Sequence, residues 1–168
     1  MTYRRISVAL KSQTGNKLLG LLMLLAIIVS CTPGKIYEKH VKMKNLAWNR
    51  FDTVYFDVPI KDIGTDYDMY LAIRHITDIP YNKLEVYFDF TTPGGETRIR
   101  KTKIPIKDDK GKNLGDGMGE LWDVQVPVWQ GFRFTTPGTC KFRVSSAMSH
   151  LNIIGIIEVG LVIRKSRK

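Results

Sequence analysis

The sequence around one cysteine indicates covalent modification of its sulfur atom. Cys31 follows Ile28, Val29 and Ser30, so two aliphatic residues and one small residue lead directly to a thiol. In its ionised form a thiol is a nucleophile and can be alkylated. The apolar run before it covers only residues 18–29, whereas a helix needs about 20 apolar residues to cross a membrane.

The residues before this run have the layout of a secretory signal peptide. Arg4, Arg5, Lys11 and Lys17 precede the apolar residues, and residues 1–30 contain no acidic residue. A basic segment, a short apolar segment and a small residue at the cleavage point are typical of such peptides. Residues 1–30 are therefore predicted to be a helical signal peptide that is removed.

Residues 28–31 match the bacterial lipobox. In lipoproteins of that type the cysteine sulfur receives a diacylglycerol, the chain is cut before the cysteine, and the new amino terminus receives a further acyl chain such as palmitate. Several acyl chains anchor a protein far more firmly than one, because each buried methylene contributes about 0.8 kcal/mol. We predict that Cys31 is the lipidation site. The alternative, an uncleaved anchor helix, does not account for the small residue and the cysteine at the end of the run.

The remaining chain has the length of one domain and is basic. The whole chain has 26 Lys and Arg residues against 16 Asp and Glu residues, for a formal net charge of +10, and four of the positive residues lie in the signal peptide. Basic residues also gather in residues 164–168, where they either favour anionic lipid headgroups or form a solvated end. The sequence contains no nucleic-acid-binding motif, so no nucleic acid partner is expected.

Period-two alternation of apolar and polar residues predicts strands along most of the chain. The expected strands cover residues 51–58, 68–76, 84–90, 97–106, 121–129, 140–148 and 158–164. Strands with one apolar face pack as two sheets, so we predict an all-β sandwich of about seven or eight strands, jelly-roll-like. Residues 31–47 are expected to be a lipidated tether and residues 48–168 the sandwich. Residues 148–157 are ambiguous between a helical turn and a strand.

Residue types that carry catalysis or bind metals form no recognisable arrangement. His40, His75 and His150 lie far apart, and no Gly-x-Ser-x-Gly elbow surrounds the serines near His150. The polar loop of residues 107–119 does not fit a calcium loop, because Leu114 stands where glycine is required. We predict no enzymatic activity, no cofactor, no metal site and no small-molecule substrate.

One tryptophan and the second cysteine are singled out by their parity in the predicted strands. Trp122 shares the parity of the apolar valines that follow it and is expected in the core, whereas Trp129 has the opposite parity and is expected to be exposed for partner binding. Cys140 shares the parity of Phe142 and Val144. We expect Cys140 to be a buried free thiol, because lipid occupies the sulfur of Cys31.

Three segments resemble the gliding motility lipoprotein GldH family. They are residues 67–74 together with 80–82, residues 114–123, and residues 134–163, and the lipobox and length also fit. The resemblance implies an outer-membrane lipoprotein associated with gliding motility and type IX secretion, with other cell-envelope proteins as partners and no catalytic residue. The absence of an acidic run after Cys31 favours the periplasmic face over the cell surface. A lipid-anchored glycan- or peptide-binding module is the alternative that the residues leave open.

Overall fold

β-Strands account for almost all regular structure in residues 34–166, which are the residues that this computed structural model describes. Among them, eight strands have at least seven residues: β1 (Lys35–Lys42), β3 (Val54–Ile60), β4 (Asp66–Ile76), β5 (Lys83–Thr91), β6 (Thr97–Pro105), β8 (Leu121–Arg133), β9 (Gly138–Ser146) and β11 (Ile156–Lys165). Three short strands, β2 (Ala47–Asn49), β7 (Asp116–Met118) and β10 (Asn152–Ile154), and the 3-10 turn η2 (Lys44–Leu46) complete the described part. The all-β prediction is confirmed, and the predicted helical signal peptide of residues 1–30 lies outside the described residues.

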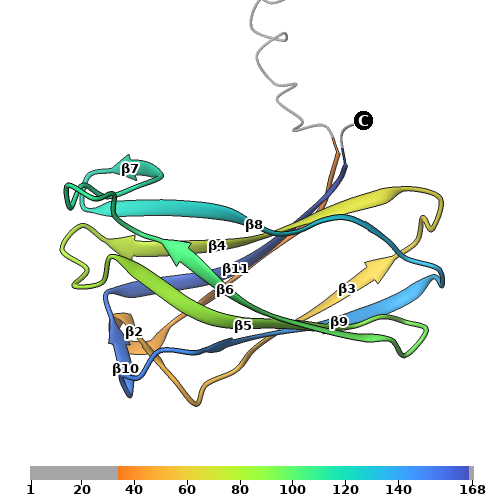
Figure 1. The fold of residues 1–168 in the computed structure, drawn as a ribbon, viewed down its shortest axis with the longest axis horizontal. Coiled ribbons are helices and arrows are strands. Elements are labelled where there is room, and N and C mark those ends of the chain that lie inside the picture. Colours follow the sequence, from red (N-terminus) through yellow and green to blue (C-terminus); the bar gives the residue numbers. More distant parts are fainter. Residues whose placement is uncertain (1–33, 167–168) are drawn as a thin grey trace, which may run out of the picture. The chain divides into compact units, whose positions relative to one another are not determined.

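Two antiparallel sheets face each other (Figure 1). One has the strand order β1-β11-β4-β8-β7, and the other has the order β3-β9-β5-β6. The pairings are nested, because β1 pairs with β11, β3 with β9, β4 with β8 and β5 with β6. Such nesting is what a single long hairpin of strands produces when it rolls into two layers, so the sandwich is a jelly roll. No helix in residues 34–166 is long and apolar enough to cross a membrane.

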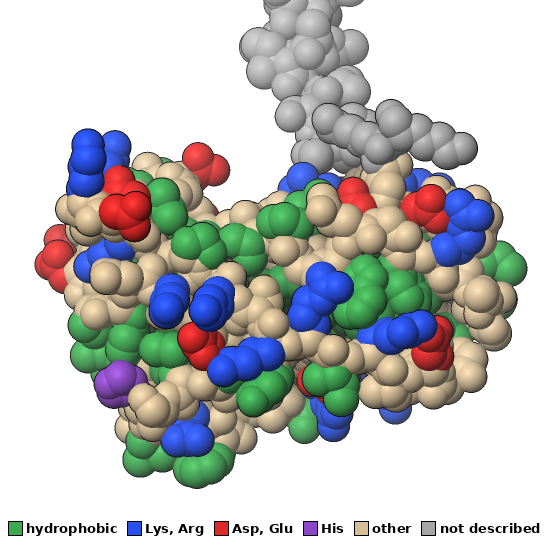
Figure 2. All heavy atoms as spheres, viewed as in Figure 1, with side chains coloured by type: hydrophobic (Ala, Val, Ile, Leu, Met, Phe, Trp, Pro, Cys, Tyr) green, Lys and Arg blue, Asp and Glu red, His purple; other side chains and the backbone are tan. Residues whose placement is uncertain are grey.

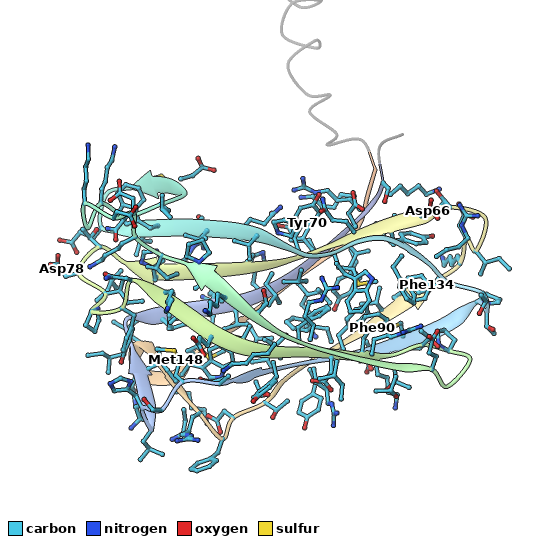
Figure 3. All side chains as sticks on the ribbon, in the orientation of Figure 1. Asp66, Tyr70, Asp78, Phe90, Phe134 and Met148 are labelled. Carbon is cyan, nitrogen blue, oxygen red and sulfur yellow. The ribbon has the colours of Figure 1, made fainter. Side chains whose placement is uncertain are left out.

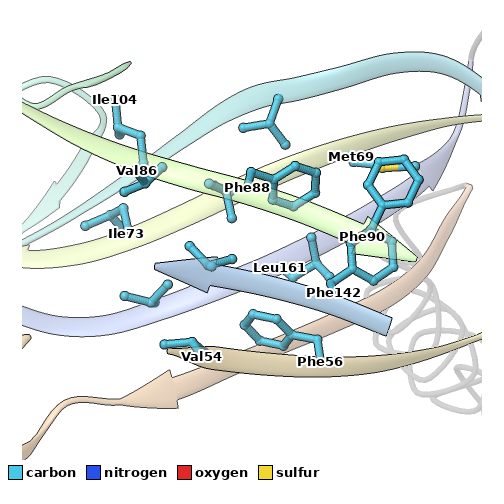
Figure 4. Close-up of a cluster of buried hydrophobic side chains, with 14 of the residues drawn as sticks. Val54, Phe56, Met69, Ile73, Val86, Phe88, Phe90, Ile104, Phe142 and Leu161 are labelled. Atoms are coloured by element: carbon cyan, nitrogen blue, oxygen red, sulfur yellow. The ribbon is translucent and has the colours of Figure 1, made fainter. Parts of the chain in front are cut away.

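The core lies between the two sheets, and the strands supply it with side chains from alternate positions. In β3 every second residue from Val54 to Ile60 is buried and the others are exposed. Phe56 from β3, Phe88 and Phe90 from β5 and Phe142 from β9 meet Leu161 from β11 in this layer (Figure 4). Because successive side chains of a strand point to opposite faces, the period-two pattern of the sequence places these residues inward.

The segment after Cys31 is a strand over most of its length and not a free tether. β1 pairs with β11 from Lys35 opposite Arg164 to Lys42 opposite Glu158. The prediction of a tether over residues 31–47 is therefore wrong from Lys35 onward. β1 is an edge strand in which only Tyr37 and Val41 are half-buried and all other residues are exposed. Two apolar residues four positions apart give too weak an alternation to indicate a strand.

The ambiguous segment of residues 148–157 contains a short strand and no helical turn. β10 pairs with β2, and Gly155 then adopts a φ of +86° before β11 begins. A Cβ atom at this position would lie 3.2 Å from side-chain atoms of Ile76 and Ile79. Glycine is therefore required here both for the positive φ and for the close packing.

Candidate functional site

The first and last described residues lie side by side at one end of the sandwich (Figure 1). The backbone N–H of Lys165 donates to the carbonyl oxygen of Gly34 at 2.8 Å, and Lys35 pairs with Arg164. Cys31, the predicted lipidation site, precedes Gly34 by three residues and lies outside the described residues. We call this region, made of Gly34, Lys35, Arg164 and Lys165, the anchor end.

Charged residues at the anchor end are arranged in pairs. The Lys165 ammonium lies 2.8 Å from an Asp62 carboxylate oxygen, and this hydrogen bond holds the pKa of Asp62 below its usual value. Arg133 similarly contacts Asp66 at 2.6 Å. Exposed ion pairs contribute about 0–1 kcal/mol, so these pairs shape the surface charge more than they stabilise the fold. Within the basic segment of residues 164–168, the charge of Lys165 is therefore partly neutralised by Asp62.

Trp129 is half-buried and packs against the core, so the expectation that it is exposed for partner binding is wrong. Its ring meets Phe90 edge-on with 5.4 Å between ring centroids and Phe132 with 6.0 Å. Figure 3 shows Phe90 and Phe134, members of the same aromatic cluster, between the two sheets.

A β-bulge explains the error for Trp129. In the pairing of β8 with β4, Met69 lies opposite Trp129 and Tyr70 opposite Pro127, so Val128 is an extra residue in β8. An extra residue interrupts the alternation of side chains between the two faces. Val128 is 2% exposed, and Trp129 after it also packs inward. Nothing in the residue types of this segment indicates where the extra residue falls.

Arg100 from β6 covers the outer side of Trp129. Its guanidinium carbon lies 4.2 Å from the centroid of the indole ring, and its Nη1 donates to the carbonyl oxygen of Val128 at 2.8 Å. A cation placed over an indole face is attracted by about 0.5–2 kcal/mol. A sugar ring stacking on Trp129 would have to displace this arginine. In Figure 2 apolar side chains are visible over this part of the sandwich, bordered by Lys and Arg side chains.

Trp122, which was expected in the core, is instead half-buried at the edge of a surface cavity. Its indole N–H donates to the Thr77 hydroxyl at 3.1 Å. The ring packs on Gly117, where a Cβ atom would come within 2.9 Å of it. The cavity has a volume of about 630 Å³ and is lined by Trp122 and the loop residues Asp108, Lys112, Asn113, Leu114, Gly115, Asp116, Gly117 and Gly119.

The three histidines lie in three separate environments. His75 is fully buried, and burial lowers its pKa. His40 lies on the outer face of the five-stranded sheet near Glu158, at 3.9 Å. His150 packs edge-on against Tyr81 with 5.4 Å between centroids. Within residues 34–166, no group of three or more His, Cys, Asp or Glu side chains is arranged to hold a metal ion.

Cys140 is fully buried between the sheets, as predicted from its parity. Burial in these apolar surroundings raises the pKa of its thiol to about 12. The ionised form, which reacts with alkylating reagents, is therefore scarce at neutral pH in the folded protein.

Thiol labelling is expected to require unfolding. In the folded protein with its anchor cysteine lipidated, a maleimide should label Cys140 slowly, and denaturant should make labelling fast because the buried thiol becomes accessible. Cys140→Ala should lower the free energy of unfolding by only about 1 kcal/mol, through a small void. Fast labelling of the native protein, measured by intact mass, would contradict the burial.

Comparison with known proteins places the sequence among lipoproteins. The family model of the GldH lipoproteins matches residues 35–163. The gliding motility lipoprotein GldH of Flavobacterium johnsoniae is 24% identical over 154 residues, covering 87% of this chain and 95% of that protein.

Two solved structures of carbohydrate-active enzymes show weak likeness. A 4-O-methyl-α-glucuronidase with specificity for decorated arabinogalactans aligns with 77% of this chain and 14% of its own, at 13% identity and a TM-score of 0.37. An exo-β-1,3-galactanase from Phanerochaete chrysosporium aligns with 77% of this chain and 26% of its own, at 14% identity and a TM-score of 0.33. Both TM-scores are too low to carry an argument about fold or function.

Proposed function

The chain belongs to the GldH lipoprotein family, and we propose that it is a lipid-anchored outer-membrane component of the gliding motility and type IX secretion apparatus. The observation that carries this proposal is the match to the gliding motility lipoprotein GldH along 95% of that protein. A match of this extent leaves no separate domain of the relative to account for its role. The transfer of the role is by analogy within the family.

Lipid on Cys31 fixes the orientation of the sandwich in this proposal. Only Thr32 and Pro33 separate Cys31 from Gly34. An extended chain spans at most about 3.3–3.6 Å per residue, so a link of two residues gives the lipid anchor little reach beyond Gly34. The anchor end is then the part of the domain nearest the bilayer, and Arg164 is the basic residue there that favours anionic lipids, since Lys165 is paired with Asp62. The absence of an acidic run after Cys31 supports the periplasmic face.

The placement of the histidines and of Cys140, which are residue types that often carry catalysis, supports a structural role. The three histidines are separated, and Cys140 is buried with a raised pKa. The ion pairs of the outer sheet face are satisfied within the fold, since the Arg74 guanidinium holds the Asp123 carboxylate at 2.8 and 2.9 Å. Partners of the domain are then other cell-envelope proteins.

The alternative, a glycan-binding module, has one supporting observation. The cavity beside Trp122 combines an indole ring, two carboxylates and the Oδ1 atom of Asn113, which is buried and makes no hydrogen bond within residues 34–166. Aromatic faces and such acceptors recognise sugars. In this alternative, Trp122→Ala abolishes binding to a glycan array while Trp129→Ala leaves its pattern unchanged.

Deletion of the gene in its own bacterium tests the proposal. Cells without the protein are expected to lose movement over glass and to secrete less type IX cargo into the medium. Expression of the full chain should restore both. Unchanged movement and unchanged cargo levels in cells shown to lack the protein would refute the proposed role.

A further inference from the structure

Four large apolar side chains are exposed at the corner formed by β2 and β10. The exposed fractions of Leu46, Phe51, Leu151 and Ile154 are 51%, 77%, 54% and 55%. We call these four residues the distal patch. Its two segments are hydrogen-bonded to each other, because Gly155 N–H donates to the Leu46 carbonyl at 2.7 Å and Arg50 N–H donates to the Leu151 carbonyl at 2.8 Å. In Figure 2 hydrophobic side chains gather at this corner of the molecule.

The two-stranded ribbon that carries the distal patch is held firmly by its other face. Trp48 of β2 and the opposing Ile153 of β10 are 1% and 0% exposed and belong to the core. The Trp48 indole N–H also donates to the carbonyl oxygen of Asp52 at 2.9 Å. A surface that is already ordered loses little conformational entropy when a partner binds.

The backbone next to the ribbon is left-handed at two consecutive residues. Asn45 and Leu46 have φ values of +53° and +52°, a left-handed conformation that leucine rarely adopts. Such strain persists at positions that serve function. The side chain of Leu46 is 51% exposed, so burial in the domain does not offset the strain at this residue.

A cavity beside the distal patch has the dimensions and lining of a docking pocket. It has a volume of about 380 Å³ and is lined by the apolar residues Val41, Met43, Ala47 and Val54 together with Lys42, Lys44, Asp52, Thr53 and Tyr55. Interfaces are dominated by a few anchor side chains that fill such pockets. Lys42, Lys44 and Arg50 outnumber the single acid Asp52 in residues 42–52, so the complementary surface is apolar with an acidic rim.

The distal patch lies one strand length from the anchor end. β1 and β11 run from Lys35 opposite Arg164 to Lys42 opposite Glu158, and eight residues at about 3.3 Å each span roughly 26 Å. In the proposed function the lipid anchor joins the domain at Gly34, at the other end of these strands, so the occupant that we assign to the patch is a protein and not lipid.

We propose that the distal patch and its cavity are the docking surface for an envelope protein that presents an apolar segment flanked by carboxylates. The inference rests on the proposed function, because it names the surface through which the anchored domain joins the apparatus. The partner's apolar side chain fills the 380 Å³ cavity, and its carboxylates face Lys42 and Lys44.

Photo-crosslinking of the full lipidated chain in its own cells tests the docking surface. A benzoylphenylalanine probe at Leu151 or Ile154 is expected to give one adduct with another protein. The same probe at Ile99 or Tyr87, which are 66% and 43% exposed on the four-stranded sheet, serves as the control. It is expected to give about tenfold less adduct, which is the change in affinity that loss of one strong interface residue causes. Lys42→Glu with Lys44→Glu should reduce the adduct by a similar factor and leave membrane retention unchanged.

Phe51→Ser with Ile154→Ser is expected to remain lipidated but to fail to restore movement and secretion in the deletion strain. Ile99→Ser with Tyr87→Ser is the matched control and should restore both. Adducts only with lipid, only with a second copy of this chain, equal from all four positions, or none at all would each overturn the inference. Full restoration by the patch variant would overturn it too while leaving the proposed function intact. A deletion without phenotype refutes the proposed function, and the adduct pattern still decides the docking surface.

Discussion

Replacing Cys31 by serine is expected to abolish fatty-acid attachment and to leave residues 1–30 uncleaved, because the cut before this position follows attachment of the diacylglycerol. A serine hydroxyl is not ionised at neutral pH and lacks the nucleophilicity of a thiolate. Without the acyl chains the protein loses about 0.8 kcal/mol for every methylene that would have been buried in the bilayer. Metabolic labelling with a radioactive fatty acid measures the first effect, and the intact mass of the protein measures the second.

The second cysteine provides the matched control for this experiment. Cys140 is fully buried and cannot meet a lipid-transferring enzyme in the folded protein. Cys140→Ala should therefore incorporate as much fatty acid as the parent and stay in the membrane fraction. Equal labelling of the parent and the Cys31→Ser variant would show that Cys31 is not the attachment site.

Phe90→Ala is expected to lower the free energy of unfolding by about 3–5 kcal/mol. Phe90 is 1% exposed and lies at the centre of the aromatic cluster, with ring centroids of Phe142 at 5.3 Å and Phe132 at 5.0 Å. The cavity left by its ring is surrounded by residues of both sheets, which limits collapse around it. The loss is a large share of the roughly 5–15 kcal/mol that stabilises a typical domain.

Urea unfolding of the non-lipidated protein, followed by circular dichroism, measures this loss. Ile99→Ala is the control, because Ile99 lies opposite Asp89 on the neighbouring strand but is 66% exposed. Its effect should stay below about 1 kcal/mol. An unchanged urea midpoint for Phe90→Ala would contradict the packing of the core around this ring.

The alternation of apolar and polar residues predicts most strands of this fold, because most of the strands bury one face. The expected strand over residues 84–90, for instance, is β5 (Lys83–Thr91), with Leu84, Val86, Phe88 and Phe90 buried. The same reasoning misses β1, since an edge strand with two half-buried residues carries little alternation. It also misplaces Trp129, because the bulge at Val128 depends on how β8 pairs with β4 and not on residue type.

Local sequence patterns do not predict features that join distant parts of the chain. The nested pairing that makes the sandwich a jelly roll joins β1 to β11 across the whole domain. The distal patch likewise forms only because Ile154 of β10 lies opposite Ala47 of β2. In the sequence Phe51 and Leu151 each stand between polar neighbours, whereas Leu46 and Ile154 each adjoin another apolar residue. Neither pattern indicates a surface patch, because exposed apolar residues are common on proteins.

Complementation of the deletion strain by the Cys31→Ser variant tests the central claim most directly. The account predicts that the variant folds and accumulates to the level of the parent but restores neither movement nor secretion, because its domain lacks the acyl chains that hold it at the outer membrane. Recovery of both by the variant, at matched protein levels and with no fatty acid incorporated, would contradict a function that depends on lipid anchoring.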